Sequence, residues 1–532
     1  MSSSPADFKK RLFFLWQERP LTIVLGIALL IRLLAAFFSK GYAFSDDHFC
    51  VIRPAQYWLY GFPFWLDMDH PPLHSMTYAG LHYLLFDGLT QLGITQATTK
   101  MLIARLLHAL YSLLTVYFGY KITLQLTNKE VARKAGLLLA LLWFMPFLSV
   151  KNLVEMVCIP ICLAGFYGLL KAHQSGSRTS SLWFWAGVCF GIAFVLRLHT
   201  ILFAGGVGLV MLYRRQWLGS LWFTLGYLLA AASIQGAIDA YFFDYPFHSL
   251  VSYFTYNANN AYNYVTGGPE KFFFTIIGFL VPPISLFLLY GFVRARKIAP
   301  MLFVAALVFF IFHSAFPNKQ ERFILPMLPL IVILGTIGWE QFIVKSAFWQ
   351  KRDKLLKACW VFFWVLNLTA ALGLSLTYSK KSRIAPLLYL SEKSDLQAVL
   401  IEGQKVPMPP VFYLDRLAAH YEVFRGDELG TLPVNPTKEQ LSPNYPLVFT
   451  WGENKDIVAI EAEIQQTQQR PNYLVLIGQK DLQSRLAGIS QLFPDQTITL
   501  ETSIQPALYD RILHFLNPHV HQDEYVSIYR VE

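Results

Sequence analysis

Long apolar segments separated by short polar stretches make up most of the chain before residue 380. Each segment is long enough, or nearly so, to cross the roughly 30 Å hydrocarbon core of a bilayer as a helix. The pattern predicts eleven such segments, near residues 22–38, 101–120, 135–150, 154–170, 182–197, 199–213, 217–239, 272–293, 299–315, 323–342 and 358–378. Two of the intervening polar stretches are long, at about 39–100 and 240–271. Loops of that length usually carry function or short helices of their own.

After about residue 380 the pattern changes to short apolar runs. Alternating strands and helices favour a small α/β domain. The candidate strands are Val411–Leu414, Leu447–Trp451, Tyr473–Ile477 and Tyr525–Val531, and the candidate helices are Asp456–Gln468 and Asp481–Phe493. The prediction is therefore an α-helical polytopic membrane domain over residues 1–379, with about eleven transmembrane helices, followed by a small α/β domain over residues 380–532.

Composition and charge extend this prediction. Hydrophobic residues make up 55% of the chain and charged residues 15%, against about 25% charged in soluble proteins, which excludes a string of soluble domains. The net charge of +10 does not indicate nucleic-acid binding, because the Lys and Arg residues concentrate in alternate gaps between the apolar segments. Since cationic loops stay cytoplasmic, the N-terminus is predicted inside, and both long loops and the α/β domain outside. The five cysteines show neither a disulfide framework nor metal-type spacing.

An acidic pair, Asp46 and Asp47, directly follows the first apolar segment. Carboxylates beside a bilayer are costly to desolvate, and a raised pKa would suit one of them to act as a general base. A solvated loop start is the alternative. Further along the same loop, Asp67 and Asp69 suggest either a DxD motif for a metal and a nucleotide sugar, or a stretch in which two prolines direct His70.

Other polar groups lie on the predicted outer side. Lys319 and Arg322 are three residues apart and would share a helix face. They stand on the side that cations normally avoid, so an anionic lipid phosphate is the ligand that they favour. The remaining groups, for which ordinary polar helix ends are the alternative, are Asn152, Glu155, Arg197, His199 and Asp239. A catalyst at this surface needs an activated, membrane-bound substrate, and a polyprenyl-phosphate sugar fits.

These motifs resemble those of the GT-C superfamily of integral-membrane glycosyltransferases, in particular the family 22 mannosyltransferases. That family places an acidic pair, often His-Pro-Asp-Glu, after its first span, where this chain has Phe44-Ser45-Asp46-Asp47. Its His-Lys-Glu-x-Arg-Phe pattern is matched by Asn318-Lys319-Gln320-Glu321-Arg322-Phe323, and its Asn-x-x-Glu by Asn152 and Glu155. The stretches His70-Pro71-Pro72-Leu73 and Ala104-Arg105-Leu106 are similar instead to the family 39 and aminoarabinose-transferase branch.

The resemblance implies a GT-C fold and inverting transfer of a hexose, mannose among the candidates, from a polyprenyl-phosphate sugar to a lipid-linked or glycan acceptor. It implies Asp46 as the general base, with Asp47 orienting the acceptor. The implied donor-phosphate ligands are Lys319, Arg322, Arg197 and His70. The implied acceptor or cavity residues are Asp69, Asn152, Glu155, His199, Asp239, Asn257 and Glu321. No metal-ligand set is predicted, although some relatives use a divalent metal.

Two other classes of function fit part of the sequence. A polytopic lipid or glycan transporter (a flippase) also has many spans, but it predicts midplane charges and inverted repeats, and neither is visible in the sequence. A scaffold protein that presents the α/β domain leaves the acidic pair and the outer cations unexplained. The Asn-x-Ser/Thr match at Asn367 lies inside an apolar segment, so the outer domain lacks glycosylation sites. This favours a bacterial inner membrane.

Overall fold

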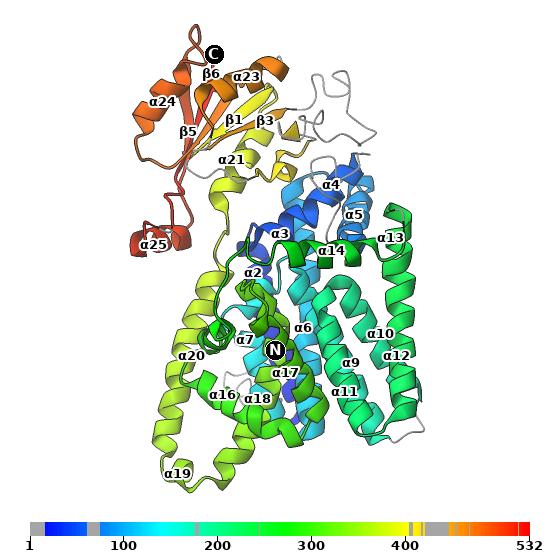
Figure 1. The fold of residues 1–532 in the computed structure, drawn as a ribbon. Coiled ribbons are helices and arrows are strands. Elements are labelled where there is room, and N and C mark those ends of the chain that lie inside the picture. The colour runs from blue at the N-terminus through cyan, green and yellow to red at the C-terminus, as the bar shows by residue number, and fades with distance from the viewer. Residues whose placement is uncertain are drawn as a thin grey trace, which may run out of the picture. The chain divides into compact units, whose positions relative to one another are not determined.

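The computed structural model describes residues 16–60, 75–175, 180–243, 245–403, 408–416, 419–420, 446–452, 455–467, 469–519 and 521–532. The chain divides into two compact units (Figure 1). Unit 1 comprises Met1–Phe37, Leu73–Tyr78 and Ala104–Leu376, and unit 2 comprises Phe38–Pro72, Ala79–Ile103 and Thr377–Glu532. The first long loop therefore groups with the C-terminal residues rather than with the helices that flank it in the sequence.

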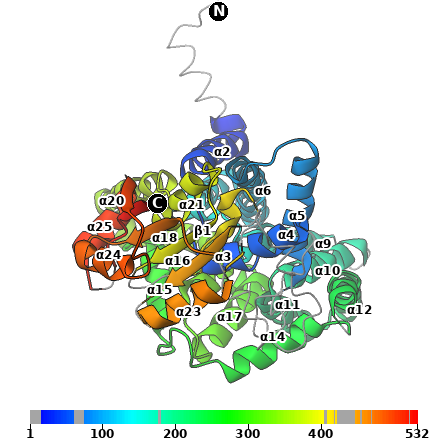
Figure 2. The same ribbon diagram turned by 90° about the horizontal axis from the view of Figure 1, so that it is seen from above.

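Unit 1 is helical. Its longer helices are α2 (Pro20–Phe38), α6 (Ala97–Leu126), α7 (Lys129–Leu141), α9 (Val154–Gln174), α10 (Ser180–Leu196), α11 (Ile201–Tyr213), α12 (Trp217–Ala231), α14 (His248–Asn259), α16 (Ile284–Arg294), α17 (Pro300–Ala315), α18 (Leu328–Lys345) and α20 (Asp353–Ser375). The shorter ones are α8 (Met145–Leu148), α13 (Ala237–Phe242), α15 (Lys271–Phe279) and α19 (Ala347–Gln350). Helix α10 packs against both α9 and α12, and α11 packs against α17 (Figures 1 and 2).

All eleven predicted apolar segments fall on helical elements. Within the described residues, six helices are long and apolar enough to cross a membrane, and the bent pair α15–α16 would add a seventh. Three other predicted segments, at residues 182–197, 199–213 and 299–315, form helices of only 10–17 residues. The segment at 135–150 is divided between α7 and α8.

The break between α7 and α8 is held by a distant side chain. The Asn367 Oδ1 atom, on α20, accepts a 2.9 Å hydrogen bond from the backbone N–H of Trp143, and its Nδ2 donates to the Leu141 carbonyl at 2.7 Å. Backbone groups freed by a helix break need such partners in an apolar environment. Asn367 is fully buried and thus has a structural role.

Arg32, inside α2, is also fully buried. Its guanidinium donates to the Ser112 hydroxyl and the Ala140 carbonyl, both at 3.0 Å. These bonds connect α2 with α6 and with the end of α7. These contacts indicate that Arg32 has a structural role. The sequence alone did not distinguish this role from a catalytic one.

Unit 2 contains a six-stranded sheet in the order β2-β3-β1-β4-β6-β5. The first four strands in this order pair in parallel. Strand β6 pairs antiparallel with its two neighbours, β4 and β5. They are β1 (Ala398–Glu402), β2 (Ala419–His420), β3 (Leu447–Trp451), β4 (Tyr473–Ile477), β5 (Ile498–Ile504) and β6 (Val526–Val531). The unit's helices are α3 (Ser45–Phe49), α4 (Ile52–Leu59), α5 (Met76–Gln91, which begins in unit 1), α21 (Lys381–Ser391), α23 (Ile457–Thr467), α24 (Leu482–Ser490) and α25 (Leu508–Leu516).

The sheet tests the strand predictions. Those at Leu447–Trp451, Tyr473–Ile477 and Tyr525–Val531 are confirmed by β3, β4 and β6. The one at Val411–Leu414 is wrong, since these residues form a buried 3₁₀ helix. Pro409 and Pro410 precede it, and prolines cannot donate to a strand ladder. Strands β1, β2 and β5 were not predicted.

Candidate functional site

Three charged side chains meet inside unit 1, and we call Glu155, Arg197 and Arg322 the Glu155 cluster. Glu155 lies in the first turn of α9, Arg197 directly follows α10, and Arg322 lies in the 3₁₀ helix Glu321–Met327 before α18. The Arg197 Nη2 atom is 2.9 Å from Oε1 of Glu155, and the Arg322 Nε atom is 3.8 Å from the same oxygen. Glu155 is fully buried, and the arginines are only 5% and 7% exposed. The structure thus brings together residues 167 positions apart in the chain.

Aromatic rings enclose the Glu155 cluster. The guanidinium carbons of Arg197 and Arg322 lie 5.2 Å and 5.4 Å from the centroid of the Phe323 ring, within the range of cation–π attraction. The ring of His199 packs edge-on against Phe323. The His199 Nε2 atom and the Tyr253 hydroxyl share a 2.9 Å hydrogen bond. These rings shield the charges from water, which strengthens any electrostatic interaction made there.

The Glu155 cluster holds two guanidinium groups beside one carboxylate. Arg322 also donates from Nε to Oε1 of Gln320 at 2.9 Å. A phosphate accepts several charge-assisted hydrogen bonds from arginine. The arrangement is therefore suited to an anionic group.

Lys319 has a different environment from the one its sequence pattern suggested. Its Nζ atom donates to the carbonyls of His313 at 2.8 Å, Ser314 at 2.7 Å, and Phe316. The ammonium thus satisfies carbonyls at the C-terminal end of α17, a favourable place for a cation. Burial lowers the pKa of Lys319, and Glu270 acts in the opposite direction. Its predicted contact with a donor phosphate stays a prediction, and it would require Lys319 to release a carbonyl.

Asp239 lies at the start of the second long predicted loop and binds the segment that follows it. It is fully buried, and its carboxylate accepts hydrogen bonds from Nε2 of Gln235 at 2.8 Å and from the hydroxyl and backbone N–H of Ser249 at 2.8 and 3.0 Å. Ser249 lies in the first turn of α14, and Tyr253 follows one turn later. Asp239 therefore positions the helix that carries the partner of His199.

The other predicted residues of unit 1 lie in varied surroundings. Asn152 is buried just before α9. Asn257 donates from Nδ2 to the Tyr253 carbonyl at 2.8 Å, a bond within α14. Glu321 is exposed, and its Oε1 lies 3.7 Å from Nζ of Lys271.

The acidic pair lies in unit 2, in the short helix α3. Asp47 is buried and accepts a 2.9 Å hydrogen bond at Oδ2 from the backbone N–H of Ala43. Asp46 is partly exposed, so a reacting hydroxyl has better access to its carboxylate. The pair thus divides into one buried carboxylate bound to the backbone and one accessible carboxylate.

His48, next to the acidic pair, has aromatic partners that the sequence did not predict. The His48 ring is stacked between the rings of Tyr42 and Tyr413, with centroids 5.1 and 5.7 Å away. Burial, with a smaller contribution from Arg53, lowers the pKa of His48 to about 3. The imidazole is therefore neutral at physiological pH. The partners lie on segments about 365 residues apart in the sequence, and no local pattern announces such a pairing.

His70 and Asp69, like Asp67, lie outside the described residues. Among the residues that are described, no group of three His, Cys, Asp or Glu side chains could hold a metal ion. Two alternatives for this stretch stay predictions. One is a metal-binding DxD motif, and the other is a His70 side chain oriented by the two prolines that follow it.

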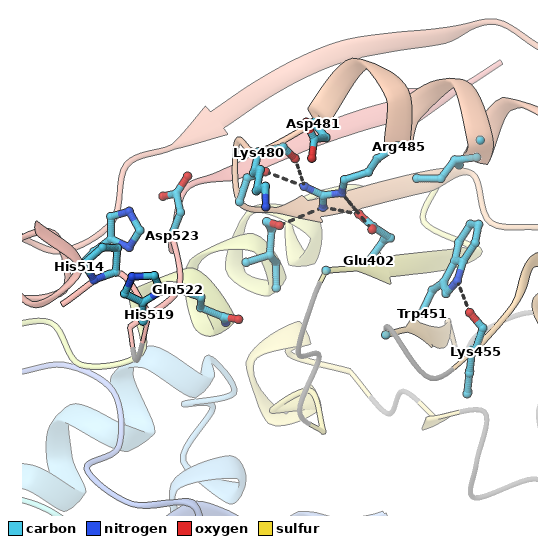
Figure 3. A pocket seen from close by; sticks show the side chains of 17 residues that line it. Glu402, Trp451, Lys455, Lys480, Asp481, Arg485, His514, His519, Gln522 and Asp523 are labelled. Carbon is cyan, nitrogen blue, oxygen red and sulfur yellow. Dashed lines mark hydrogen bonds and ion pairs between the residues drawn. The ribbon is translucent and has the colours of Figure 1, made fainter.

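Unit 2 also contains a cavity of about 790 Å³ at the carboxyl ends of β1, β3 and β4 (Figure 3). This is the edge at which open α/β sheets often bind ligands. Its central cation, Arg485, donates from Nε to Glu402 at 3.0 Å and from Nη1 and Nη2 to the carbonyls of Gly478 and Ile477, both at 2.9 Å. Lys455 pairs with Glu463 at 3.1 Å. These charged groups hold the surrounding loops in place, so they do not point to a ligand.

Comparisons with known proteins bear on the whole chain. A sequence model described as the Alg9-like mannosyltransferase family matches residues 23–399. The curated protein GPI mannosyltransferase 3 of Candida albicans is 23% identical over 325 residues, which cover 59% of this chain and 63% of that protein. The match thus spans less than two thirds of this relative.

Solved structures resemble the chain in fold. A crystal structure of ArnT from Cupriavidus metallidurans bound to undecaprenyl phosphate superimposes with a TM-score of 0.61 at 14% identity, covering 96% of this chain and 97% of the other. The Archaeoglobus fulgidus oligosaccharyltransferase tethered with an acceptor peptide gives a TM-score of 0.53 at 10% identity, covering 87% and 70%. Together with the family match, this likeness confirms the predicted GT-C fold. The helices that are long and apolar enough to cross a bilayer agree with an integral membrane protein.

Proposed function

Because the chain belongs to the Alg9-like mannosyltransferase family, we propose that it is a membrane glycosyltransferase. Its donor is a polyprenyl-phosphate sugar, its transferred group is a hexose, with mannose the first to be tested, and its acceptor is a lipid-linked or glycan hydroxyl. The family match supports the reaction class. The fold likeness to a protein solved with undecaprenyl phosphate supports the lipid part of the donor.

The observation that carries this proposal is the Glu155 cluster. A polyprenyl-phosphate sugar brings an anionic phosphate to the edge of the bilayer, and its departure as polyprenyl phosphate increases the negative charge on that group. Two shielded guanidiniums held by one carboxylate are suited to stabilise such charge, since preorganised cations act most strongly where charge develops in the transition state. We assign Arg197 and Arg322 to the donor phosphate, with Glu155 as the carboxylate that orients them.

The proposed reaction is a direct displacement. The acceptor hydroxyl oxygen forms a bond to the anomeric carbon of the sugar while the bond from that carbon to the phosphate oxygen breaks. The proton of the hydroxyl passes to Asp46, the accessible member of the acidic pair, which acts as general base. Asp47, bound to the Ala43 amide, supports the position of Asp46. Attack opposite to the leaving group inverts the anomeric configuration.

We also propose the topology. The cationic gaps favour a cytoplasmic N-terminus and an extracytoplasmic unit 2. About eleven spans are proposed, with α10, α11 and α17 crossing together with their flanking residues and the bent pair α15–α16 counted as one span. The bacterial inner membrane stays our proposed location on the ground of the missing glycosylation sites, and the likeness to a Candida albicans protein makes a eukaryotic membrane the alternative.

The test is a transfer reaction with purified protein in proteoliposomes, radiolabelled polyprenyl-phosphate mannose and a lipid extract as acceptor. The proposal predicts release of free polyprenyl phosphate and label in a new glycolipid or glycan, with both lost in the variant Asp46→Asn. A transporter would move the donor across the bilayer with the sugar still attached. Intact donor in all conditions, including other hexoses, would overturn the proposal.

A further inference from the structure

Helix α25 of unit 2 carries an apolar face that no described residue of its own unit covers. Its nine residues read LYDRILHFL, and none of them is buried. Leu508, Ile512, Phe515 and Leu516 are 71%, 47%, 85% and 70% exposed. These positions have the spacing i, i+4, i+7 and i+8, which places them on one side of a helix. The core of the unit is formed by strands β1, β3, β4 and β6 with α23 and α24, without any residue of α25.

The place of α25 within unit 2 indicates what covers this face. Helix α20 is long and apolar enough to cross the membrane and ends at Ser375, and unit 2 resumes at Thr377. Lys380 and Arg383 follow within a few residues and therefore lie near the membrane surface. Burial and Glu524 raise the pKa of Asp510 on α25, while Lys380 and Arg383 lower it. The hydroxyl of Ser382, next to these cations, also donates a hydrogen bond to Glu524 in the segment that follows α25. The region of α25 thus lies close to the chain segment that leaves the bilayer.

Charge complementarity supports the same location. Lys380 and Arg383 act on Asp510 of α25, and cations near a membrane surface are attracted to lipid phosphates. Arg511 borders the apolar face on the helix itself, where a long cation can reach the headgroups while its neighbours enter the acyl region. A short helix with one apolar face, one polar face and flanking cations is typical of an interfacial helix.

We propose that α25 lies in the membrane–water interface, with Leu508, Ile512, Phe515 and Leu516 inserted into the lipid of the outer leaflet. The lipid surface attaches unit 2 to the membrane in addition to the covalent connections between the two units. It limits how far the unit can tilt away from the bilayer. This inference concerns attachment alone and does not depend on the proposed transfer reaction.

Photo-crosslinking in nanodiscs of phosphatidylcholine and phosphatidylglycerol tests the proposal. A benzoylphenylalanine replaces Phe515 in one variant of the full-length protein and Val458 in the other. Val458 is the matched control, because it is 68% exposed on α23 of the same unit. After irradiation, mass spectrometry of the labelled peptides counts lipid adducts. The proposal predicts at least about tenfold more lipid adduct at position 515 than at 458, as expected for an inserted apolar face.

Two results would overturn the proposal. One is an equal adduct yield at both positions, which would mean that α25 projects into water. The other is crosslinking of position 515 mainly to protein, in the form of covalent dimers or internal links, which would assign the face to a second copy or to another part of the chain. Melting curves that match the wild type establish that both variants are folded before irradiation.

Discussion

Replacing Glu155 by glutamine tests whether the Glu155 cluster is a buried ionic site. At 2.9 Å between Nη2 of Arg197 and Oε1 of Glu155, the Coulomb attraction is about 6 kcal/mol at an effective dielectric constant of about 20. Desolvation of the two ions offsets part of it. Removing one partner of a buried pair still costs about 3–5 kcal/mol, because the other charge is left uncompensated. Glutamine keeps the shape of the side chain, so the effect comes from charge.

The assay is thermal unfolding of the purified protein, followed by tryptophan fluorescence, with and without undecaprenyl phosphate. We expect Glu155→Gln to lower the apparent melting temperature clearly. We also expect the ligand to stabilise this variant more than the wild type, because a phosphate supplies the missing negative charge. The matched control is Glu130→Gln, which removes a 3.3 Å surface pair with Lys134 whose carboxylate is 65% exposed. That change should cost less than about 0.5 kcal/mol. Equal melting of the two variants would refute the reasoning.

Three further predictions follow from the structure. Asp46→Asn should lower the transfer rate about 100-fold or more with an unchanged melting temperature, whereas the exposed Glu130 should tolerate glutamine with about wild-type turnover; normal rates for Asp46→Asn would exclude it as the base. Arg32→Met should destabilise the protein by about 2 kcal/mol or more, since the charge-assisted hydrogen bonds of its guanidinium are lost, and leave KM unchanged; a raised KM would indicate substrate contact. Because the pKa of His48 is lowered from 6.5 to about 3, the unfolded chain binds a proton there that the folded chain does not, so stability falls as pH drops from 6.5 towards 3. The variant His48→Phe should show a shallower acid-side loss of melting temperature than the wild type, and an identical slope would argue against the shift.

The helices were predictable from the sequence, because an apolar run of spanning length has few other ways to satisfy its backbone. The break at residues 142–144 was not, since its partner, Asn367, is on a different helix. Strands β3 and β4 have apolar runs with clear limits. Strand β1, in contrast, directly follows the helical stretch of α21 and a short turn, and its five residues carry little signal of their own.

The candidate site was predictable residue by residue but not as an arrangement. Sequence patterns selected Glu155, Arg197 and Arg322 as polar groups near helix ends. That they share one oxygen depends on how α9, α10 and α18 pack. Lys319 is the opposite case. The sequence assigned its ammonium to a phosphate, but in the structure it donates to carbonyls at the end of the preceding helix, α17. Local spacing does not distinguish these two partners.

The central claim is that Arg197 and Arg322 bind the phosphate of a polyprenyl-phosphate donor. Its most direct test is the dissociation constant for undecaprenyl phosphate, measured for the wild type, Arg322→Gln and the control Arg294→Gln, whose arginine is exposed on α16 beside Tyr290. Loss of a charge-assisted hydrogen bond of about 1.5–3 kcal/mol predicts roughly 10- to 150-fold weaker binding for Arg322→Gln and wild-type binding for the control. Wild-type affinity in Arg322→Gln would contradict the account.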